Sequence, residues 1–200
     1  MILDHHRKGK LLATKKNPNE PDQSLELDEN QPLWVWDEYS KADIEGKLVY
    51  HPLVFDKNNH SGKTKAEILA ENENAGWSLL LIEDNPNIPR AGQGETVGGR
   101  KRMEAGRTPA ECLVDLDPAK SGLTPEDWLA QAITYLEETN QVIDDYDGNG
   151  STNYNLGGWF PASGSVSYAY WDRGRQASLG GGGPGYRVGR YGVRSGVRVD

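Results

Sequence analysis

Residues 157–200 read GGWFPASGSVSYAYWDRGRQASLGGGGPGYRVGRYGVRSGVRVD, and this segment decides the fold of the chain. It holds 12 of the 24 glycines and 4 of the 9 tyrosines. It has six arginines and two aspartates but no lysine or glutamate, so its formal charge is +4, against −12 for the other residues. Glycine costs about 1 kcal/mol at each interior helical position, which excludes a helix here. Tyrosine, arginine and serine spaced between glycines instead predict strands and tight turns that carry a recognition surface.

The whole chain has 200 residues, enough for one domain with a sizeable core. Its hydrophobic fraction is only 36% and its mean hydropathy is −0.74, but it contains six tryptophans. We therefore expect a loop-rich domain with tryptophan anchors in its core. The net charge of −8 and the pI near 5.1 argue against general nucleic-acid binding.

The sequence also bounds disulfides, membrane insertion and export. Cys112 is the only cysteine, so no internal disulfide can form. No stretch approaches the roughly eighteen apolar residues of a membrane span, so we expect no membrane insertion. The first residues, MILDHHRKGKLLATKK, lack the apolar core of a secretory signal. We therefore expect no standard signal peptide.

The chain divides into two parts near residue 30. Residues 1–30 are rich in Asn, Pro, Asp and Glu, which predicts an N-terminal arm or strand plus a linker. Residues 31–200 are expected to form a single domain. In its first half, residue patterns predict a strand or a tryptophan-rich anchor over 33–36, a strand over 47–55, a helix over 63–74 and a buried strand over 77–82.

Two helix starts carry clear sequence signals. In residues 108–111 (TPAE), threonine is the N-cap, proline the first helical residue and glutamate the third, which is a capping box. Residues 124–127 (TPED) repeat this arrangement with aspartate at the third position. We expect the second helix to cover about residues 125–139 and to pack through an apolar face that includes Trp128.

Residues 145–150 (DYDGNG) match the first half of a calcium-binding loop. Asp145, Asp147 and Asn149 would supply oxygen ligands two residues apart, and Gly150 the sharp turn. The twelfth position is Leu156 instead of the glutamate that completes such a loop. Calcium binding is therefore one interpretation, and a plain Asp/Asn/Gly turn, which the incomplete match favours, is the other.

The spacing of other residues excludes the common catalytic motifs. Residues 62–64 (GKT) lack the first glycine of a phosphate loop, because residue 57 is lysine. The four histidines make no metal-binding pair, and no G-x-S-x-G nucleophile motif occurs. Cys112 is expected to be a small core residue. A Ser–His–Asp site stays open, because its members can lie far apart in a sequence. None of these patterns calls for a cofactor apart from the calcium considered above.

Residues 165–171 (SVSYAYW) alternate as a strand does, with Tyr168 and Tyr170 on one face and Trp171 on the other. Glycines 180–183, together with Pro184, predict a turn. Two further strands are expected over residues 186–190 and 191–199. The scaffold residues expected inside the fold are Trp159, Trp171, Val193 and Val197.

The order of motifs in this segment resembles a known family. PASG at 161–164, then Tyr-Trp-x-x-Gly at 170–174, a polar run, and YGVRSGVRV at 191–199 are similar to variable proteins of diversity-generating retroelements. The character of the segment is closest to the variable proteins of archaeal viruses. The resemblance covers residues 157–199 and implies an α+β, C-type lectin-like fold, in the version shared with formylglycine-generating enzymes. Such a fold packs two helices on a small, mostly antiparallel, loop-rich sheet.

In that family a retroelement randomises adenines in selected codons, usually Asn codons. Such codons can yield Tyr, Ser, Gly, Arg, Asp, Val, Ala and others, but not Trp, Gln, Lys, Glu or Met. The resemblance implies a variable region over about residues 160–199 that forms a ligand-binding face. Its candidate variable positions are Ser165, Ser167, Tyr168, Tyr170, Arg175, Ser178, Gly181, Gly182, Tyr186, Arg190 and Tyr191.

The function that the resemblance implies is non-enzymatic binding of protein or glycan targets on a cell surface, as in a receptor or adhesin. Display on a virion or another surface is expected, and otherwise a cytoplasmic location. A relative of formylglycine-generating enzymes is one alternative, although that chemistry uses paired cysteines and this chain has one. A structural virion or adhesin module without a diversified site is another.

Overall fold

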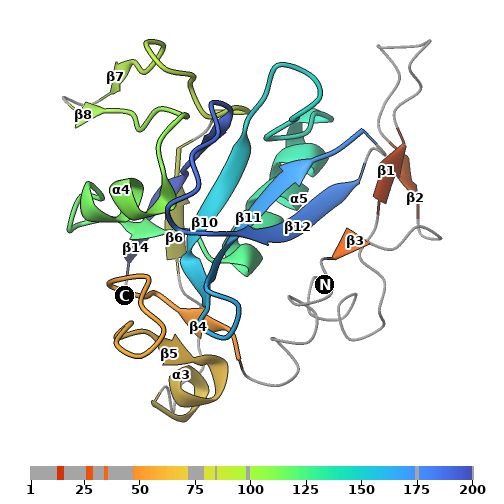
Figure 1. The fold of residues 1–200 in the computed structure, drawn as a ribbon. Coiled ribbons are helices and arrows are strands. Elements are labelled where there is room, and N and C mark those ends of the chain that lie inside the picture. Colours follow the sequence, from red (N-terminus) through yellow and green to blue (C-terminus); the bar gives the residue numbers. More distant parts are fainter. Residues whose placement is uncertain are drawn as a thin grey trace.

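A computed structural model describes residues 13–15, 26–28, 34–35, 47–71, 79–83, 85–97, 100–173 and 176–199 (Figure 1). These residues form a mixed α/β structure with three helices and largely antiparallel sheets. This confirms the mixture of helices and sheet that the sequence predicts. In the N-terminal arm, β1 (Ala13–Lys15) pairs antiparallel with β2 (Glu26–Asp28) in a two-stranded sheet of its own.

The main sheet has seven strands and is built around three long ones in its centre (Figure 1). The strand order is β3-β12-β11-β10-β4-β5, and β13 pairs with β10 in parallel. The strands are β3 (Trp34–Val35), β12 (Ala177–Gly182), β11 (Ser165–Trp171), β10 (Thr152–Phe160), β4 (Val49–Tyr50), β5 (Lys63–Thr64) and β13 (Tyr191–Gly192).

β4 is much shorter than the strand predicted over residues 47–55. His51 has a φ of 50°, which turns the chain out of the extended conformation directly after Tyr50. Pro52 follows and has no backbone N–H to give to a ladder. The strand therefore ends after two residues.

The register of β10 against β11 determines which of their side chains share a face of the sheet. Tyr154 lies opposite Tyr168, and Asn153 lies opposite Ala169. The register then shifts between Asn155 and Trp159. Gly158 lies in this irregular stretch, where a Cβ would come within 2.7 Å of the Ser167 hydroxyl oxygen. The bulge therefore requires a residue without a side chain at this position.

Both predicted capping boxes are confirmed. In α4 (Pro109–Val114), Thr108 Oγ1 accepts from the Glu111 N–H and the Glu111 carboxylate accepts from the Thr108 N–H. In α5 (Pro125–Thr139), Thr124 and Asp127 make the same two bonds. A shorter helix, α3 (Lys65–Glu71), follows β5 within the range predicted as helical.

The core has two parts, one on each face of the main sheet. Trp128 and Leu129 of α5 pack on the face that carries Ala169 and Trp171. Cys112 of α4 belongs to the second cluster, with Trp159, Val166 and Val193. Because neighbouring side chains of a strand point to opposite faces, α4 and α5 lie on opposite sides of β11, with α5 behind the strands in Figure 1. Trp159, Trp171 and Val193 are buried, as predicted for scaffold residues.

A second sheet contains β6 (Leu79–Ile82), β14 (Ser195–Val199) and β9 (Ser121–Gly122), in that order. The prediction of a buried strand here is wrong for two of its residues, because Leu79 is 58% exposed and Leu81 is 56% exposed. β6 is the end strand of this sheet, so only its other face, with Leu80 and Ile82, packs against the core. Val197, predicted to be internal, pairs with Leu81 and is half-buried.

The structure corrects three predictions for the C-terminal segment. The strand predicted over residues 191–199 is interrupted at Val193 and Arg194, so that β13 belongs to the main sheet and β14 to the second sheet. Gly180 and Gly182, predicted to form a turn, belong to β12 and pair with β11. Residues 186–190, predicted to be a strand, are irregular, and turns close from Gly183 to Tyr186 and from Val188 to Tyr191. A short hairpin of β7 (Thr96–Val97) and β8 (Arg100–Lys101) completes the described elements.

Candidate functional site

Five tyrosines from four segments meet on the face of the main sheet opposite α5. β10 supplies one, β11 two, β13 one, and the loop after α5 one. We call them the tyrosine cluster: Tyr146, Tyr154, Tyr168, Tyr170 and Tyr191.

Four rings of the cluster form a closed circuit of contacts. The Tyr146 ring centre lies 5.6 Å from that of Tyr170 and 6.0 Å from that of Tyr191. The Tyr168 ring centre lies 6.1 Å from that of Tyr170 and 5.6 Å from that of Tyr191. Three of these four contacts are edge-on, at 66°, 88° and 66°. Such pairs contribute about 0.5–1.5 kcal/mol each beyond area burial, so the rings hold one another in place.

The fifth tyrosine anchors the circuit to the core. Tyr154 is fully buried, its ring lies 5.3 Å from that of Tyr191, and its hydroxyl donates to the Tyr186 carbonyl oxygen at 3.0 Å. The four circuit tyrosines are half-buried, whereas Tyr186 is 60% exposed. The site is thus a buried aromatic base with partly exposed rings above it.

A glycine of β12 makes room for Tyr168. A Cβ on Gly180 would lie only 2.7 Å from two ring carbons of Tyr168, so the ring lies directly over the backbone of β12. At Gly182 the same ring is 3.7 Å from an added Cβ, an ordinary contact distance. The two glycines therefore differ: Gly180 is required by the ring, and Gly182 is not.

Arg190 ties the loop of residues 145–150 to the cluster. Its Nη2 donates to the carbonyl oxygens of Tyr146 and of Gly150, the latter at 3.0 Å, and lies 3.5 Å from that of Gly148. Its guanidinium carbon also lies 4.6 Å from the centre of the Tyr146 ring. The side chain thus combines hydrogen bonds to the loop with a cation–π contact.

These contacts bear on the calcium interpretation. The Asp147 carboxylate accepts from Arg173 Nε at 2.6 Å, and the Asp145 carboxylate accepts from the Gly148 N–H at 3.0 Å. The backbone carbonyl oxygen of Asn149 accepts from Arg90 Nη2 at 3.2 Å. In the described part of the chain, no three His, Cys, Asp or Glu side chains lie close enough to hold a metal. The contacts favour the plain turn, and calcium binding at Asp145, Asp147 and Asn149 stays a prediction.

Four phenol groups of the cluster have a raised pKa. Burial, with a smaller contribution from neighbouring tyrosines, raises the pKa of Tyr168, Tyr170 and Tyr191 above the usual value. Burial raises the pKa of Tyr154 further still. These four tyrosines can therefore offer ring faces and hydroxyl groups to a ligand, but not phenolate charge.

The predicted variable positions fall into four groups. Tyr168, Tyr170, Tyr186, Arg190 and Tyr191 lie in or beside the tyrosine cluster, and Ser165, Gly181 and Gly182 are half-buried. Ser167 and Ser178 are fully buried: the Ser167 hydroxyl donates to the Asn155 carbonyl oxygen and that of Ser178 to the Asp172 carboxylate. Arg175 lies outside the described residues.

The buried serines correct the predicted surface. Ser167 sits on the same face of β11 as Ala169 and Trp171, which pack toward α5. Ser178 is opposite Tyr170 in the β11–β12 register, but its side chain is enclosed. Neither residue can touch a ligand without a rearrangement of the sheet, so we exclude both from the candidate face.

Sequence reasoning missed two sets of residues that build the site. Tyr146 and Tyr154 lie outside residues 157–200, and only the fold brings them to the cluster. A buried polar network around Arg194, Asp144 and Trp128 was also missed. The DYDGNG motif did point to the loop that carries Tyr146, but for a different chemistry.

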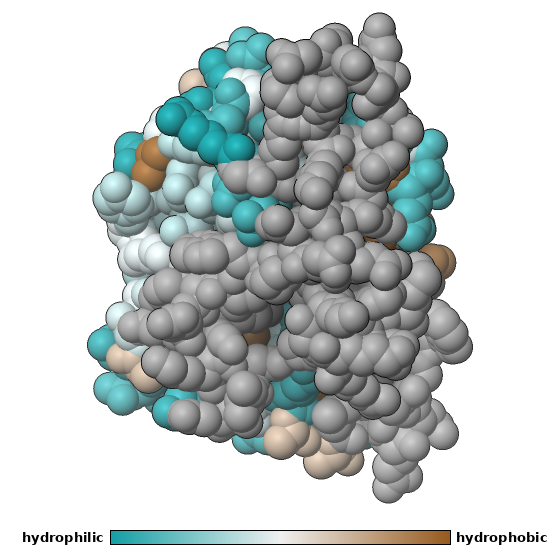
Figure 2. All heavy atoms as spheres, turned by 90° about the vertical axis from the view of Figure 1, so that its right-hand side faces the viewer, coloured by the Kyte–Doolittle hydropathy of each residue, from teal (hydrophilic) through white to brown (hydrophobic). Residues whose placement is uncertain are grey.

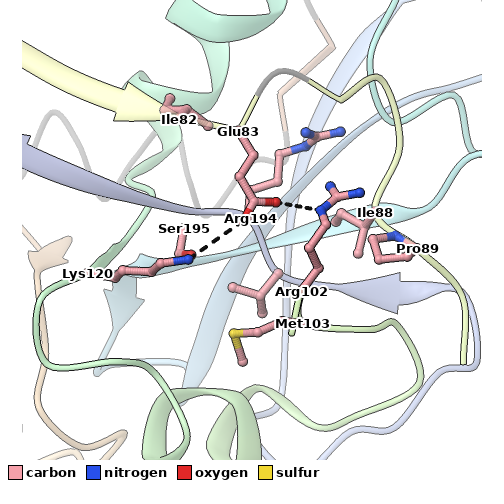
Figure 3. A pocket seen from close by; sticks show the side chains of 10 residues that line it. Ile82, Glu83, Ile88, Pro89, Arg102, Met103, Lys120, Arg194 and Ser195 are labelled. Atoms are coloured by element: carbon pink, nitrogen blue, oxygen red, sulfur yellow. Dashed lines mark hydrogen bonds and ion pairs between the residues drawn. The ribbon is translucent and has the colours of Figure 1, made fainter. Parts of the chain in front are cut away.

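A small pocket lies elsewhere, between β6, β14 and the segment before α4. Its volume is about 20 Å³, room for roughly one water molecule. Glu83 lies in it between Arg102 Nε, at 2.6 Å, and Lys120 Nζ, at 3.6 Å (Figure 3). None of the cluster tyrosines lines this pocket. Its size excludes a glycan or a peptide side chain, so the tyrosine cluster is the better candidate site.

Comparisons with protein-family models, curated proteins and solved structures found no match. Among the described residues, the longest helix has 15 residues, and no helix is long and apolar enough to cross a membrane. On the side of the molecule drawn in Figure 2, the described atoms are mostly hydrophilic or neutral, with hydrophobic atoms in small separate patches.

Proposed function

We propose that this chain is a non-enzymatic ligand-binding protein with a C-type lectin-like fold, whose C-terminal face is diversified by a retroelement. The observation that carries the proposal is the tyrosine cluster, in which partly exposed rings stand on a closely packed sheet. Tyrosine gives a large contact area at low entropic cost, and it dominates natural paratopes. Protein or glycan targets on a cell surface suit this chemistry, with display on a virion or another surface.

The alternation along β11 supports this role, because it separates two kinds of position. Ala169 and Trp171 are buried against α5, whereas Tyr168 and Tyr170 on the other face remain partly exposed. A binding face that is to vary needs such a separation, since its side chains must change without loss of the core.

The glycines after β12 also support the role. A Cβ at Gly183, Gly185 or Gly189 would meet no atom within 4 Å. Adenine-directed changes at these positions would add side chains to the surface without a steric conflict. The segment next to the exposed Tyr186 can therefore change in sequence while the sheet beneath it stays the same.

A pair of display libraries tests the proposal. The first randomises the outward positions Tyr168, Tyr170, Tyr186 and Tyr191, and the matched control randomises the inward positions Ser167, Ala169 and Leu179 of β11 and β12. We expect the outward library to keep most of its protease-resistant members and to yield binders to unrelated proteins or glycans. The inward library should lose most folded members, because its residues are buried. Equal loss of folding in both libraries would reject the proposal.

The gene supplies a second, independent test. Diversification by a retroelement requires a near-identical template repeat and a reverse transcriptase close to the coding sequence. Mismatches between template and gene should coincide with adenines in the codons for the outward positions. A gene without such a template would leave a binding protein whose face does not vary.

A further inference from the structure

The circuit of four tyrosines differs from a set of independent surface aromatics. Each ring touches two neighbours, and the contacts return to the starting ring after Tyr146, Tyr170, Tyr168 and Tyr191. The rings come from three separate segments, so the circuit exists only in the folded chain. Neighbouring rings therefore face different directions, as the angles of 66°, 88°, 66° and 40° between them show.

We propose that this circuit binds an organic cation, an alkylammonium or guanidinium group of the ligand, through the faces of the tyrosine rings. The ligand class rests on the proposed binding role of the same surface. A ring face carries partial negative charge, and a cation within about 6 Å of the ring centre gains roughly 0.5–2 kcal/mol. Several rings around one cation add to this, as in the aromatic cages that hold methylated ammonium groups.

The protein already places one cation on this circuit. The Arg190 guanidinium lies 4.6 Å from the centre of the Tyr146 ring. Its Nη2 donates to carbonyl oxygens of the 145–150 loop, which hold it there. Arg190 thus shows that a ring of the circuit accepts a guanidinium group. Because hydrogen bonds hold its side chain to the loop, Arg190 is not itself the cation that all four rings would bind.

The geometry favours a cation over a neutral sugar ring. Sugars stack on an aromatic ring that presents one open, flat face. Here the ring planes of Tyr146 and Tyr191 meet at 88°, and those of Tyr168 and Tyr191 at 66°. Rings at such steep angles suit a compact charged group, which several ring faces can approach at once.

Two carboxylates lie near the circuit, since Asp172 and Asp147 influence the phenol of Tyr170 electrostatically. Arginines of the same segment, including Arg190 on the Tyr146 ring, offset their attraction for a cation. The proposal therefore rests on the ring faces and not on the charge around them.

The test uses choline and its neutral isostere 3,3-dimethylbutan-1-ol with the complete chain. The two have the same shape, so a difference in binding reports the charge alone. We expect the choline methyl protons to shift upfield in a saturable manner, because they lie over ring faces. We expect the neutral isostere to bind at least about tenfold more weakly. Equal affinity for the two probes would overturn the proposal.

Three variants locate the site. Tyr170→Phe keeps the ring and should keep choline binding, whereas Tyr170→Leu removes the ring and should lower the affinity by about tenfold or more. Tyr135→Leu is the control, since Tyr135 packs against the core cluster that includes Trp128 and Trp171, on the other face of the main sheet. Loss of binding in Tyr135→Leu but not in Tyr170→Leu would reject the circuit as the site. A far-ultraviolet spectrum and a thermal melt of each variant check that it is folded.

The outcomes separate this proposal from the proposed function. Binders recovered from the outward library, together with no choline binding by the natural chain, would reject the cation site and leave the ligand-binding role standing. Choline binding by the natural chain, with an outward library that unfolds, would keep the cation site and reject the diversified face. If Tyr170→Leu unfolds, the comparison of choline with its isostere on the natural chain and on Tyr170→Phe still decides.

Discussion

Asp144 and Arg194 form a two-point ion pair that is buried on both sides. Arg194 Nε and Nη2 each donate to one carboxylate oxygen of Asp144 at 2.8 Å, and the two side chains are 4% and 0% exposed. Trp128 Nε1 donates to the same carboxylate at 2.8 Å. Arg194 also donates to the carbonyl oxygens of Asn85 and Pro86. The pair therefore joins α5, the loop that carries Tyr146 and the strands around Tyr191 beneath the candidate site.

Removal of one partner of this pair should be strongly destabilising. Arg194→Met leaves the Asp144 carboxylate buried without its cation, which costs about 3–5 kcal/mol in comparable pairs. Urea unfolding followed by tryptophan fluorescence measures the loss. The control is Arg173→Met, because Arg173 is 88% exposed and pairs with Asp147 at the surface. We expect little change in stability there, and similar losses in both variants would contradict the role of burial.

The two glycines beside Tyr168 should respond differently to the same substitution. Gly180→Ala places a methyl group 2.7 Å from the Tyr168 ring, so the ring must move and we expect a loss of about 1–3 kcal/mol. Gly182→Ala meets the same ring at 3.7 Å and should change stability by less than about 0.5 kcal/mol. Thermal melts of the two variants make the comparison. A Gly180→Ala protein as stable as Gly182→Ala would show that Tyr168 does not lie where we describe it.

Local sequence signals predicted the parts of the fold that depend on local chemistry. The TPAE and TPED motifs marked both helix starts because a capping box involves only four consecutive residues. The alternation of SVSYAYW predicted β11 with its correct bounds, since the period of a strand is visible within seven residues. The same alternation placed Tyr168 and Tyr170 on one face together, as the cluster requires.

Features that depend on distant partners could not be predicted. Gly180 and Gly182 look like a turn in sequence, but both pair with β11 in a strand, and at Gly180 the Tyr168 ring also requires the bare backbone. The partner of Arg194 lies fifty residues away, and nothing near either residue indicates a buried pair. Leu79 appeared buried because its run is apolar, yet burial depends on which strands flank it.

Arg190 should stabilise the 145–150 loop, and calcium should not add to the stability of the protein. Arg190→Gln removes donors from the carbonyl oxygens of Tyr146 and Gly150, and we expect a loss of about 1–2 kcal/mol. In the natural chain, calcium at about 1 mM should leave Tm unchanged, since Asp147 is already paired with Arg173. Melts with calcium and with a chelator measure this. A higher Tm with calcium, abolished by Asp147→Asn, would instead establish the calcium site.

The tyrosine cluster should give the protein a characteristic response to alkaline pH. Burial raises the pKa of Tyr168, Tyr170 and Tyr191 in the folded protein, whereas a tyrosine in the unfolded chain has a pKa of about 10. The folded state therefore binds more protons above pH 10, so the free energy of unfolding falls as pH rises through the folded pKa values. In an alkaline titration, the tyrosinate absorbance of the folded chain should rise at a higher pH than that of the chain unfolded in guanidinium. Coincident titration curves for the folded and unfolded chain would rule out burial of these rings.

Cys112 should be chemically inert until the protein unfolds. Its side chain is fully buried in the second core cluster, and burial raises the pKa of its thiol to about 11. The reactive thiolate is therefore scarce at pH 8 and also inaccessible to reagents. A disulfide-forming chromogenic reagent should release almost no colour from the native chain and one equivalent in urea. Arg194→Met, which weakens the fold elsewhere, should react faster than the natural chain, because labelling then follows transient opening. Prompt labelling of the native chain would place Cys112 at the surface and remove α4 from that face of the sheet.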